Sequence, residues 1–372
     1  MSICGSLALD SSNHYKSDSL IQMESVNDEN RSKPVNEEEE AHSQSQTESV
    51  DGEKALSQNQ KELVDGEKAH SQNTFVSYPE SINKIFIYNA SFGTRELAPA
   101  MFSAIRSVYP KPWNVEVVNS METGRDDILY ILICPAGLAG NLSVLPKYYV
   151  AWQLEDVQGN YNNPAYMETL RRALYVWDYS TFNMNILKNR DNLDTIYFPP
   201  GFSSTITTPE ILSGSYLYSD EGKDIEVLFL GYCDAYPRRV QLRDNCYKAG
   251  FRMWFVSTLD IEGMKAAIKR SKVCINMVAR EPFVLATVRL NILLSNQACI
   301  VSEESCDKEA DALYSQAGIS FVTYDQILTK TRELVDNPEL RKRSAIKGYQ
   351  WYRVHRNWTD IFDFNHYLPN QS

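Results

Sequence analysis

The feature that most constrains the fold is an alternation of short apolar runs with helical patterns, which begins near Ser81 and starts again at Ile225. The run 84–88 has the length and composition of a buried strand. The stretch after it places four apolar side chains on one helical face: Leu97, Met101, Ile105 and Val108. Strands that alternate with helices form parallel sheets joined by right-handed crossovers. The sequence therefore predicts an α/β fold with two Rossmann-like, doubly wound domains that face a cleft.

Each round of the alternation divides into expected elements. The first round predicts strands at 84–88, 113–118, 128–134, 148–154 and 194–198, with mainly helical structure over 163–188. The second predicts strands at 225–231, 253–256, 273–276, 298–301 and 319–323, and helices at 239–249, 260–270, from about 282, up to 318, and from 337 to about 354. A stretch rich in Gly, Ser and Asp at 213–224 marks the boundary. The domains are thus 80–215 and 216–372, the second with a C-terminal helix that could cross back to the first.

Residues 1–79 have a different composition from the rest of the chain. They hold 15 Asp and Glu against 6 Lys and Arg, and so carry −9 of the net charge of −11. They contain no Trp and too few apolar groups to offset the entropy of ordering, so we expect a disordered acidic tail. Removing it should shift the thermal midpoint of the remainder by no more than about 2 °C.

Charge and hydropathy narrow the choice of partners. Beyond the tail the chain is nearly neutral, at −2, which lacks the positive excess that nucleic acid binding draws on. No apolar run is long enough for a membrane span, and the N-terminus does not resemble a secretion signal. The seven cysteines form no CxxC pair and fit reduced core residues. We therefore expect a cytoplasmic protein with no nucleic acid partner and no transmembrane segment.

Histidine and glycine motifs limit the chemistry. All five histidines lie in the tail or beyond Val354, which argues against a His-based metal site or a Ser-His-Asp triad unless the C-terminal end folds back. No GxGxxG follows the first strand of either round, and no GxxxxGK[ST] occurs. We therefore expect neither a metal nor a cofactor.

Candidate anion-binding residues follow the first strand of the second round. Gly231 would let the backbone approach a phosphate closely, and Arg238 and Arg239 could hold its oxygens. Arg289 is expected near a helix start, where a cation needs an anionic partner. A ligand diphosphate is one interpretation. Surface charges, or a neighbouring Glu for Arg289, are the other.

Carboxylates are the candidates for sugar contacts and for proton transfer. Glu303 follows a predicted strand and could accept hydrogen bonds from sugar or ribose hydroxyls, or could instead cap a helix. With histidine missing, a base acting on an acceptor hydroxyl would be a carboxylate such as Glu155, Asp156 or Asp178, each of which could also be structural.

In their order along the chain, these segments resemble glycosyltransferases of the GT-B architecture, in the group that includes family 1 and family 4 sugar transferases. The resemblance rests on 149–156, on 176–185 with 196–202, and on the second-half segments 229–239, 289–291 and 300–303. It implies a nucleotide-sugar donor as substrate, held by Gly231, Arg238, Arg239, Arg289, Asn291, Ser302 and Glu303. Among the candidate carboxylates, we predict Glu155, Asp178 and Glu303 as catalytic residues, with a glycan, lipid or protein as acceptor.

The sequence departs from the family pattern at two places. Met277 or Val278 stands where the group has a His, and Ala286 stands where it has a Glu. The resemblance implies a metal-independent, Leloir-type hexosyltransferase. The departures favour the alternative, a non-catalytic GT-B-like binding or scaffold protein with a decayed donor site.

Overall fold

The structure, a computed structural model, describes residues 81–108, 114–158, 163–216, 218–280, 283–361 and 368. All of them belong to the second of the two units into which the chain divides, 64–372. The predicted tail and the first residue of the strand expected at 113–118 lie outside the described residues.

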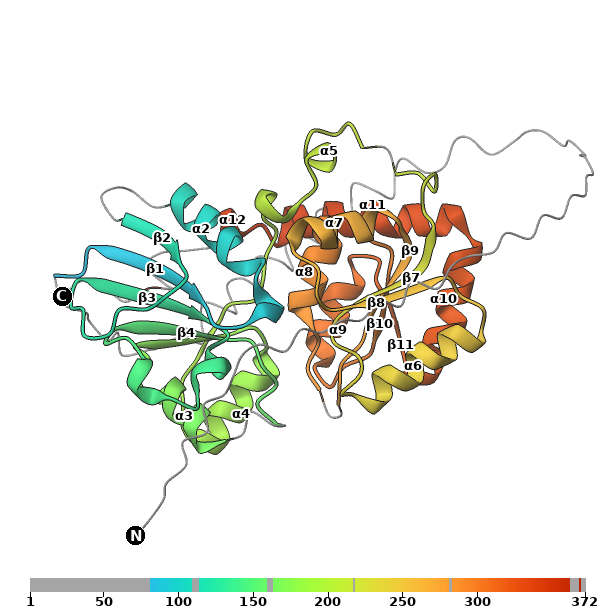
Figure 1. The fold of residues 1–372 in the computed structure, drawn as a ribbon. Helices are drawn as coiled ribbons and strands as arrows, with labels where there is room; N and C mark the ends of the chain where they lie inside the picture. The colour runs from blue at the N-terminus through green and yellow to red at the C-terminus, as the bar shows by residue number, and fades with distance from the viewer. Residues whose placement is uncertain are drawn as a thin grey trace, which may run out of the picture. The chain divides into compact units, whose positions relative to one another are not determined.

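The first half is built on a six-stranded sheet in the order β2-β1-β3-β4-β5-β6 (Figure 1). Its strands are β1 (Lys84–Asn89), β2 (Asn114–Val118), β3 (Ile128–Ile133), β4 (Tyr149–Gln153), β5 (Tyr175–Asp178) and β6 (Ile196–Tyr197). All neighbours pair in parallel. The central strands β3 and β4 are buried along their whole length, as expected for a parallel sheet covered on both faces.

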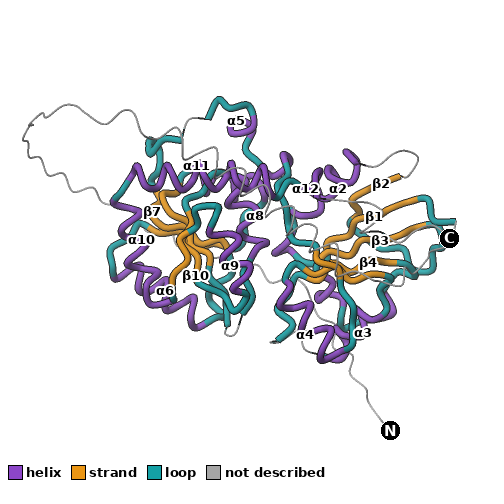
Figure 2. The backbone as a smooth tube through the Cα atoms, turned by 180° about the vertical axis from the view of Figure 1, so that it is seen from behind, coloured by secondary structure: helices purple, strands orange, loops and turns teal. Residues whose placement is uncertain are grey.

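Helices cover both faces of this sheet because its central strands carry buried, mostly apolar side chains on both faces. Its helices are α2 (Leu97–Val108), α3 (Pro164–Arg171), α4 (Thr181–Asp191) and the single-turn α5 (Pro209–Leu212). Ile131 and Ile133 pack in one core with Leu97 and Met101 of α2. Tyr130 and its alternate neighbours pack in another core with α3 and α4. Figure 2 shows α2 on one side of the sheet and α3 and α4 on the other.

The second half has a five-stranded parallel sheet in the order β11-β10-β9-β7-β8. Its strands are β7 (Ile225–Leu230), β8 (Met253–Val256), β9 (Ser271–Asn276), β10 (Ile300–Glu303) and β11 (Ser320–Val322). Its helices are α6 (Pro237–Lys248), α7 (Ile261–Lys269), α8 (Thr287–Ser295), α9 (Lys308–Ser315), α10 (Ile327–Asp336), α11 (Pro338–His355) and α12 (Trp358–Ile361). Helices α7 and α8 share a core with one face, and α6 and α10 with the other. The predicted α/β fold with two Rossmann-like sheets is confirmed.

Short 3-10 helices complete the chain: η1 (Phe92–Thr94), η2 (Pro135–Leu138), η3 (Leu142–Val144), η4 (Ser204–Ile206) and η5 (Tyr324–Gln326). Among the described residues, no helix combines the length and the apolar composition needed to cross a membrane. The boundary expected at 215/216 lies between β6, the last strand of the first sheet, and β7, the first strand of the second.

Three local expectations are wrong. The stretch 163–188 is interrupted by β5, because Tyr175–Asp178 pairs between β4 and β6 and all four side chains are buried. Helix α8 begins only at Thr287, so that Arg289 lies in its first turn. Ser302 and Glu303 are inside β10 instead of following it. The structure also adds α10, for which no helix was expected.

The end of the chain packs against the first half. Trp358 of α12 lies 5.5 Å from Trp152 and is stacked 6.0 Å from Phe198, measured between ring centroids. Its indole nitrogen donates to the Pro199 carbonyl at 3.2 Å. Gly201 has to be a glycine here, because a Cβ atom would lie within 2.2 Å of the Trp358 ring. This packing ties the last helix of the second half to strand ends of the first.

Candidate active site

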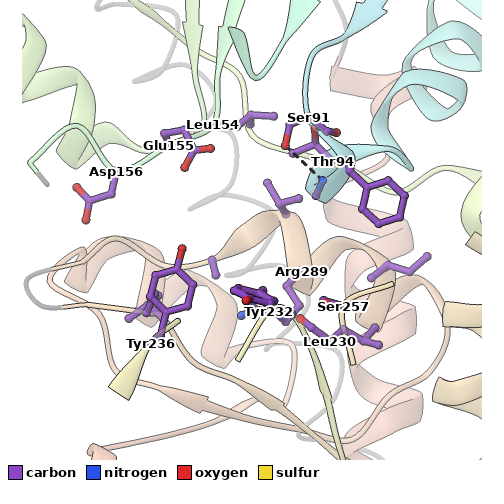
Figure 3. A pocket seen from close by; sticks show the side chains of 18 of the residues that line it. Ser91, Thr94, Leu154, Glu155, Asp156, Leu230, Tyr232, Tyr236, Ser257 and Arg289 are labelled. Atoms are coloured by element: carbon purple, nitrogen blue, oxygen red, sulfur yellow. Dashed lines mark hydrogen bonds between the residues drawn. The ribbon is translucent and has the colours of Figure 1, made fainter. Parts of the chain in front are cut away.

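A cavity of about 900 Å³ lies where loops at the carboxyl ends of strands from both sheets meet. From the first half it is lined by residues after β1, β4 and β5, among them Ser91, Thr94, Glu155, Asp156 and Tyr179. From the second half it is lined by residues after β7, β8 and β9, among them Gly231, Tyr232, Arg239, Ser257 and Arg289. Figure 3 shows Glu155 and Asp156 across the cavity from Tyr236 and Arg289. Ligands of open parallel sheets bind at this edge, so the cavity is the candidate active site.

Gly231 directly follows β7 and forms part of the cavity wall. It has φ 157°, and a Cβ atom there would lie 3.0 Å from the Phe229 ring and 3.2 Å from the guanidinium of Arg289. A larger residue would therefore push against both groups. The glycine keeps the Arg289 guanidinium and the chain end of β7 in close contact.

Among the described residues, Arg289 donates its hydrogen bonds to neutral groups. Its Nε donates to the Leu230 carbonyl at 2.6 Å, and its Nη1 donates to Asn276 Oδ1 and to the Met277 carbonyl, both at 2.9 Å. Its guanidinium also lies 4.7 Å from the centroid of the Phe229 ring. Burial, together with the positive charge of Arg239, lowers the pKa of Arg289 to about 9.

Arg239 is the second buried cation of the cavity, with a side chain only 9% exposed. Its Nη1 donates to the Tyr232 carbonyl at 2.7 Å, and its buried Nε has no hydrogen-bond partner in the described part of the chain. The guanidinium lies 4.9 Å from the Tyr236 ring and 5.1 Å from the Phe229 ring. Burial lowers its pKa as well.

Within the described part of the chain, neither Arg239 nor Arg289 has a carboxylate partner. Two buried like charges that repel each other are costly without a counter-ion. Arg289 is also in the first turn of α8, where the helix dipole disfavours a cation and favours an anion. The site therefore has unmet positive charge at a point that an anionic ligand can reach.

Arg238 is paired away from the cavity. It forms an ion pair with Glu303 and lies 4.7 Å from the ring of Tyr324. Neither Arg238 nor Glu303 lines the cavity. The reason is the sheet order: β10 is separated from β7 by β9, so its end is displaced from the loops that form the wall.

Two other predicted donor-binding residues are also in the interior. Ser302 is fully buried, and its hydroxyl accepts from Asn276 Nδ2 at 3.0 Å and donates to the Glu303 carbonyl at 3.1 Å. Asn291 is fully buried on α8, and its Oδ1 accepts from the Tyr352 hydroxyl at 3.1 Å. Of the seven residues predicted to bind the donor, the structure brings Gly231, Arg239 and Arg289 together at the cavity.

The predicted acidic residues of the first half separate into two groups. Glu155 and Asp156 line the cavity, and Glu155 Oε1 accepts from the Cys134 thiol at 3.2 Å. Asp178 is fully buried behind them. It accepts hydrogen bonds from Gln153 Nε2, Ser180 N and Asn183 Nδ2, and burial raises its pKa well above the ordinary value. Asp178 therefore organises the loop after β5 and does not reach a ligand in the cavity.

Sequence reasoning missed Glu96, between η1 and α2. The residue is 3% exposed and lines the cavity, and its buried Oε2 has no hydrogen-bond partner among the residues that the structure describes. Burial raises its pKa to about 7, against the opposing effects of its own backbone N–H and of Arg95. The same inspection of strand ends that found Gly231 would have found it, because Glu96 is in the loop that follows the first strand, β1.

Arg95 and Arg280 also line the cavity. Arg95 donates to the Leu259 carbonyl, which joins the loop after β1 to the loop after β8. Arg280 is exposed, with its guanidinium 5.6 Å from the Tyr236 ring. Among the residues that the structure describes, no three His, Cys, Asp or Glu side chains form a candidate metal site.

Comparisons with known proteins find similar structures but no similar sequences. No protein-family model matches the chain, and no curated protein matches it. An alpha-glucosyltransferase solved with UDP and a 13-mer DNA containing a HMU base is 12% identical, with a TM-score of 0.48 over 76% of this chain and 97% of that one. The T4 phage BGT solved with UDP and Mn²⁺ is 13% identical, with a TM-score of 0.47 over 75% of this chain and 98% of that one.

WaaG, a glycosyltransferase involved in lipopolysaccharide biosynthesis, is 10% identical, with a TM-score of 0.45 over 77% of this chain and 97% of that one. All three are glycosyltransferases, the class that the sequence resembles. Identities and TM-scores are low, so function is inferred below from the residues of the cavity.

Proposed function

We propose that this chain is a Leloir-type glycosyltransferase that moves a hexose from a nucleotide-sugar donor to an acceptor hydroxyl. The observation that carries the proposal is a pair of guanidiniums beside Gly231, the buried Arg239 and the half-buried Arg289, with no carboxylate partner among the described residues. A nucleoside diphosphate supplies the missing negative charge. Guanidiniums can bind its oxygens through two parallel hydrogen bonds.

The same arrangement suits the departure of the diphosphate. When the bond between the sugar and the β-phosphate breaks, negative charge grows on the phosphate oxygen. Arg239 and Arg289 are fixed by hydrogen bonds before the reaction, so they stabilise that charge without reorganising. Two fixed cations fill the role that a divalent metal has in other transferases, and the proposal therefore includes metal independence.

The acceptor would enter from the first half, past Glu155 and Asp156. A glycan, lipid or protein hydroxyl is the proposed acceptor class, and no nucleic acid is proposed because the body of the chain is nearly neutral. A cytoplasmic location is part of the proposal. The described cysteines, Cys134, Cys233, Cys246, Cys274, Cys299 and Cys306, are all free thiols, which fits a reducing compartment.

The test is titration calorimetry of the full chain with UDP, GDP and their glucose and mannose conjugates, followed by an assay of released nucleoside diphosphate. A mixed pool of glycans, lipids, peptides and oligonucleotides serves as acceptor, with and without EDTA. We expect a dissociation constant below 1 mM for at least one nucleotide and release that EDTA does not slow. Failure of every nucleotide to bind would refute the proposal, and loss of release in EDTA would refute metal independence.

One observation favours a second candidate, a non-catalytic scaffold with a decayed donor site. Ala286 is the N-cap residue of α8 and lines the cavity, yet its side chain makes no cap hydrogen bond. A Glu at this position would have put a carboxylate next to the donor sugar. A chain that binds nucleotide but never releases it from a nucleotide-sugar, with any acceptor or with water, would establish this candidate instead.

A further inference from the structure

The cavity contains one exposed aromatic side chain from each half. Phe92, in η1, is 60% exposed, and Tyr232, in the loop after β7, is 53% exposed. The other large apolar side chains that are exposed among the described residues do not line the cavity. A single exposed apolar group on a convex surface is ordinary, but an aromatic ring that is open to a cavity is typical of a side chain that contacts a ligand.

The turn that carries Phe92 is fixed by hydrogen bonds. Asn89, the last residue of β1, accepts from the Ser91 backbone N–H at 3.1 Å and from the Thr94 hydroxyl at 2.8 Å. Ser91 Oγ in turn accepts from the Gly93 N–H at 3.3 Å. Because these bonds hold the backbone on both sides of Phe92, a defined turn presents its ring to the cavity.

Arg95 fixes the ring of Phe92 from one face. Its guanidinium lies 3.9 Å from the centroid of that ring, within the range of a cation–π interaction. Its Nη1 donates to the Phe92 carbonyl at 2.5 Å, and its Nη2 donates to the Leu259 carbonyl and lies 3.6 Å from Met264 Sδ. An anchored cation thus covers one face of the ring. Since the side chain is still mostly exposed, the opposite face is open to a ligand.

Hydrogen-bonding side chains lie on the same wall of the cavity as Phe92. Cys134 directly follows β3 and contacts two of them: its thiol donates to Glu155 Oε1 at 3.2 Å, and the Ser91 side chain hydrogen-bonds to the thiol. Ser91 is the residue before Phe92, and Asp156 follows Glu155 along the cavity lining. Figure 3 shows Ser91, Glu155 and Asp156 on the side of the cavity that the first half forms. This wall therefore combines an aromatic face with carboxylates.

An aromatic face beside carboxylates fits the surface of a carbohydrate. One face of a pyranose ring carries mainly C–H groups, which pack against the negative face of an aromatic ring. Its hydroxyls lie around the rim and donate hydrogen bonds to acceptors such as Glu155 and Asp156. A lipid chain would desolvate these carboxylates without supplying a donor, and the phosphates of a nucleic acid would be repelled by them.

We propose, resting on the glycosyl transfer proposed above, that the acceptor is a carbohydrate whose pyranose ring stacks on Phe92. Tyr232 belongs to the donor side, because it follows Gly231 and its carbonyl accepts from Arg239. Phe92 belongs to the first half, and its open face determines the class of acceptor that the cavity selects.

The experiment compares the full-length wild type with Phe92→Ala and Phe92→Tyr. Tyr247→Ala is the matched control, since Tyr247 is an aromatic residue of α6 that is 70% exposed and does not line the cavity. Acceptors are supplied one class at a time: methyl pyranosides and disaccharides, diacylglycerol, Ser- and Thr-rich peptides, and single-stranded oligonucleotides. Transfer from the glucose and mannose conjugates of UDP and GDP is measured as nucleoside diphosphate released. Calorimetry measures UDP binding, and circular dichroism checks that each variant is folded.

We expect transfer to the saccharides and not to the other classes. Phe92→Ala should raise the KM for the saccharide about tenfold or more, with a smaller change in kcat, because the stacking contact with the bound acceptor is lost. Phe92→Tyr keeps the ring and should stay within about threefold of wild type. The UDP affinity of Phe92→Ala should equal that of wild type, and Tyr247→Ala should match wild type in every measurement.

A readout that needs no turnover comes from saturation-transfer NMR with a methyl pyranoside in the presence of UDP. Saturation of the aromatic protons of the wild type should pass to the C–H protons on one face of the sugar. The signal should be lost in Phe92→Ala and kept in Phe92→Tyr and Tyr247→Ala.

The outcomes separate this inference from the proposed function. Absence of nucleotide binding by the wild type overturns the proposed function and, with it, the assignment of an acceptor. Saccharide binding that depends on Phe92, without transfer from any donor, overturns glycosyl transfer but supports the carbohydrate site. Transfer to a lipid, peptide or oligonucleotide instead of a saccharide overturns only this inference, as does an unchanged KM or a loss of UDP affinity in Phe92→Ala.

Discussion

Arg238 and Arg239 are neighbours in the sequence at the start of α6, yet of the two only Arg238 has a carboxylate partner among the described residues. Arg238 is neutralised by Glu303, and the pair lies outside the cavity. Arg239 enters the cavity beside Arg289, and both keep an unbalanced charge among the described residues. The charge of a cation in an ion pair within the protein is already neutralised, so an anionic ligand stabilises it little. A buried cation without a counter-ion is stabilised when an anionic ligand binds. The difference separates a structural cation from a ligand-binding one more clearly than residue type does.

The largest expected effect is on Arg289. Arg289→Ala should weaken UDP binding about a hundredfold, near 2.7 kcal/mol, because a charge-assisted contact in a desolvated site is lost. Arg289→Lys should lose less, since it keeps the charge but not the planar fork. Calorimetry measures both variants, and circular dichroism checks that each is folded. Unchanged affinity in Arg289→Ala would mean that its bonds to Leu230, Asn276 and Met277 are its whole role.

Arg239→Ala should have a smaller effect, a loss of about tenfold or 1.4 kcal/mol. One of its nitrogens is already bonded to the Tyr232 carbonyl, and its removal also relieves the repulsion that lowers the pKa of Arg289. Fluorescence or calorimetric titration with UDP measures the change. If Arg239→Ala lost more UDP affinity than Arg289→Ala, Arg239 would contribute more to donor binding than Arg289, contrary to this prediction.

Glu303→Gln should change UDP affinity least, by less than about twofold. It should instead lower the free energy of unfolding by about 2 kcal/mol, because Arg238 loses its buried partner. Urea denaturation measures the stability, and Glu309→Gln in α9 is the control for loss of an exposed carboxylate. A tenfold loss of affinity or turnover at unchanged stability would restore Glu303 to the donor site, as the sequence predicted.

Much of the fold could be predicted from local patterns. Asn337 and Pro338 were expected to begin a helix, and the Asn337 side chain does accept from the Leu340 N–H at the start of α11. Strand β8 has the predicted bounds. The interrupting strand β5 was obscured because its four residues take their conformation from pairing with β4 and β6, which no local pattern encodes.

The sequence could predict which site residues follow the ends of strands, but not which of them reach the cavity. Gly231, Arg239 and Arg289 follow central strands of the second sheet and do reach the cavity. Asp178 and Glu303 also occur at the ends of strands, but depth and sheet position take them out of it. Glu96 was missed because a single Glu before a helix is ordinary in a sequence. Its burial, and an oxygen with no hydrogen-bond partner among the described residues, are visible only in the folded structure.

The most direct test of the central claim is a crystal structure of the full chain soaked with UDP. The account predicts diphosphate oxygens within about 3 Å of the Arg289 and Arg239 guanidiniums, beside Gly231, with the Arg238–Glu303 pair intact. A diphosphate bound at Arg238 with Glu303 displaced, or bound outside the cavity, would contradict it.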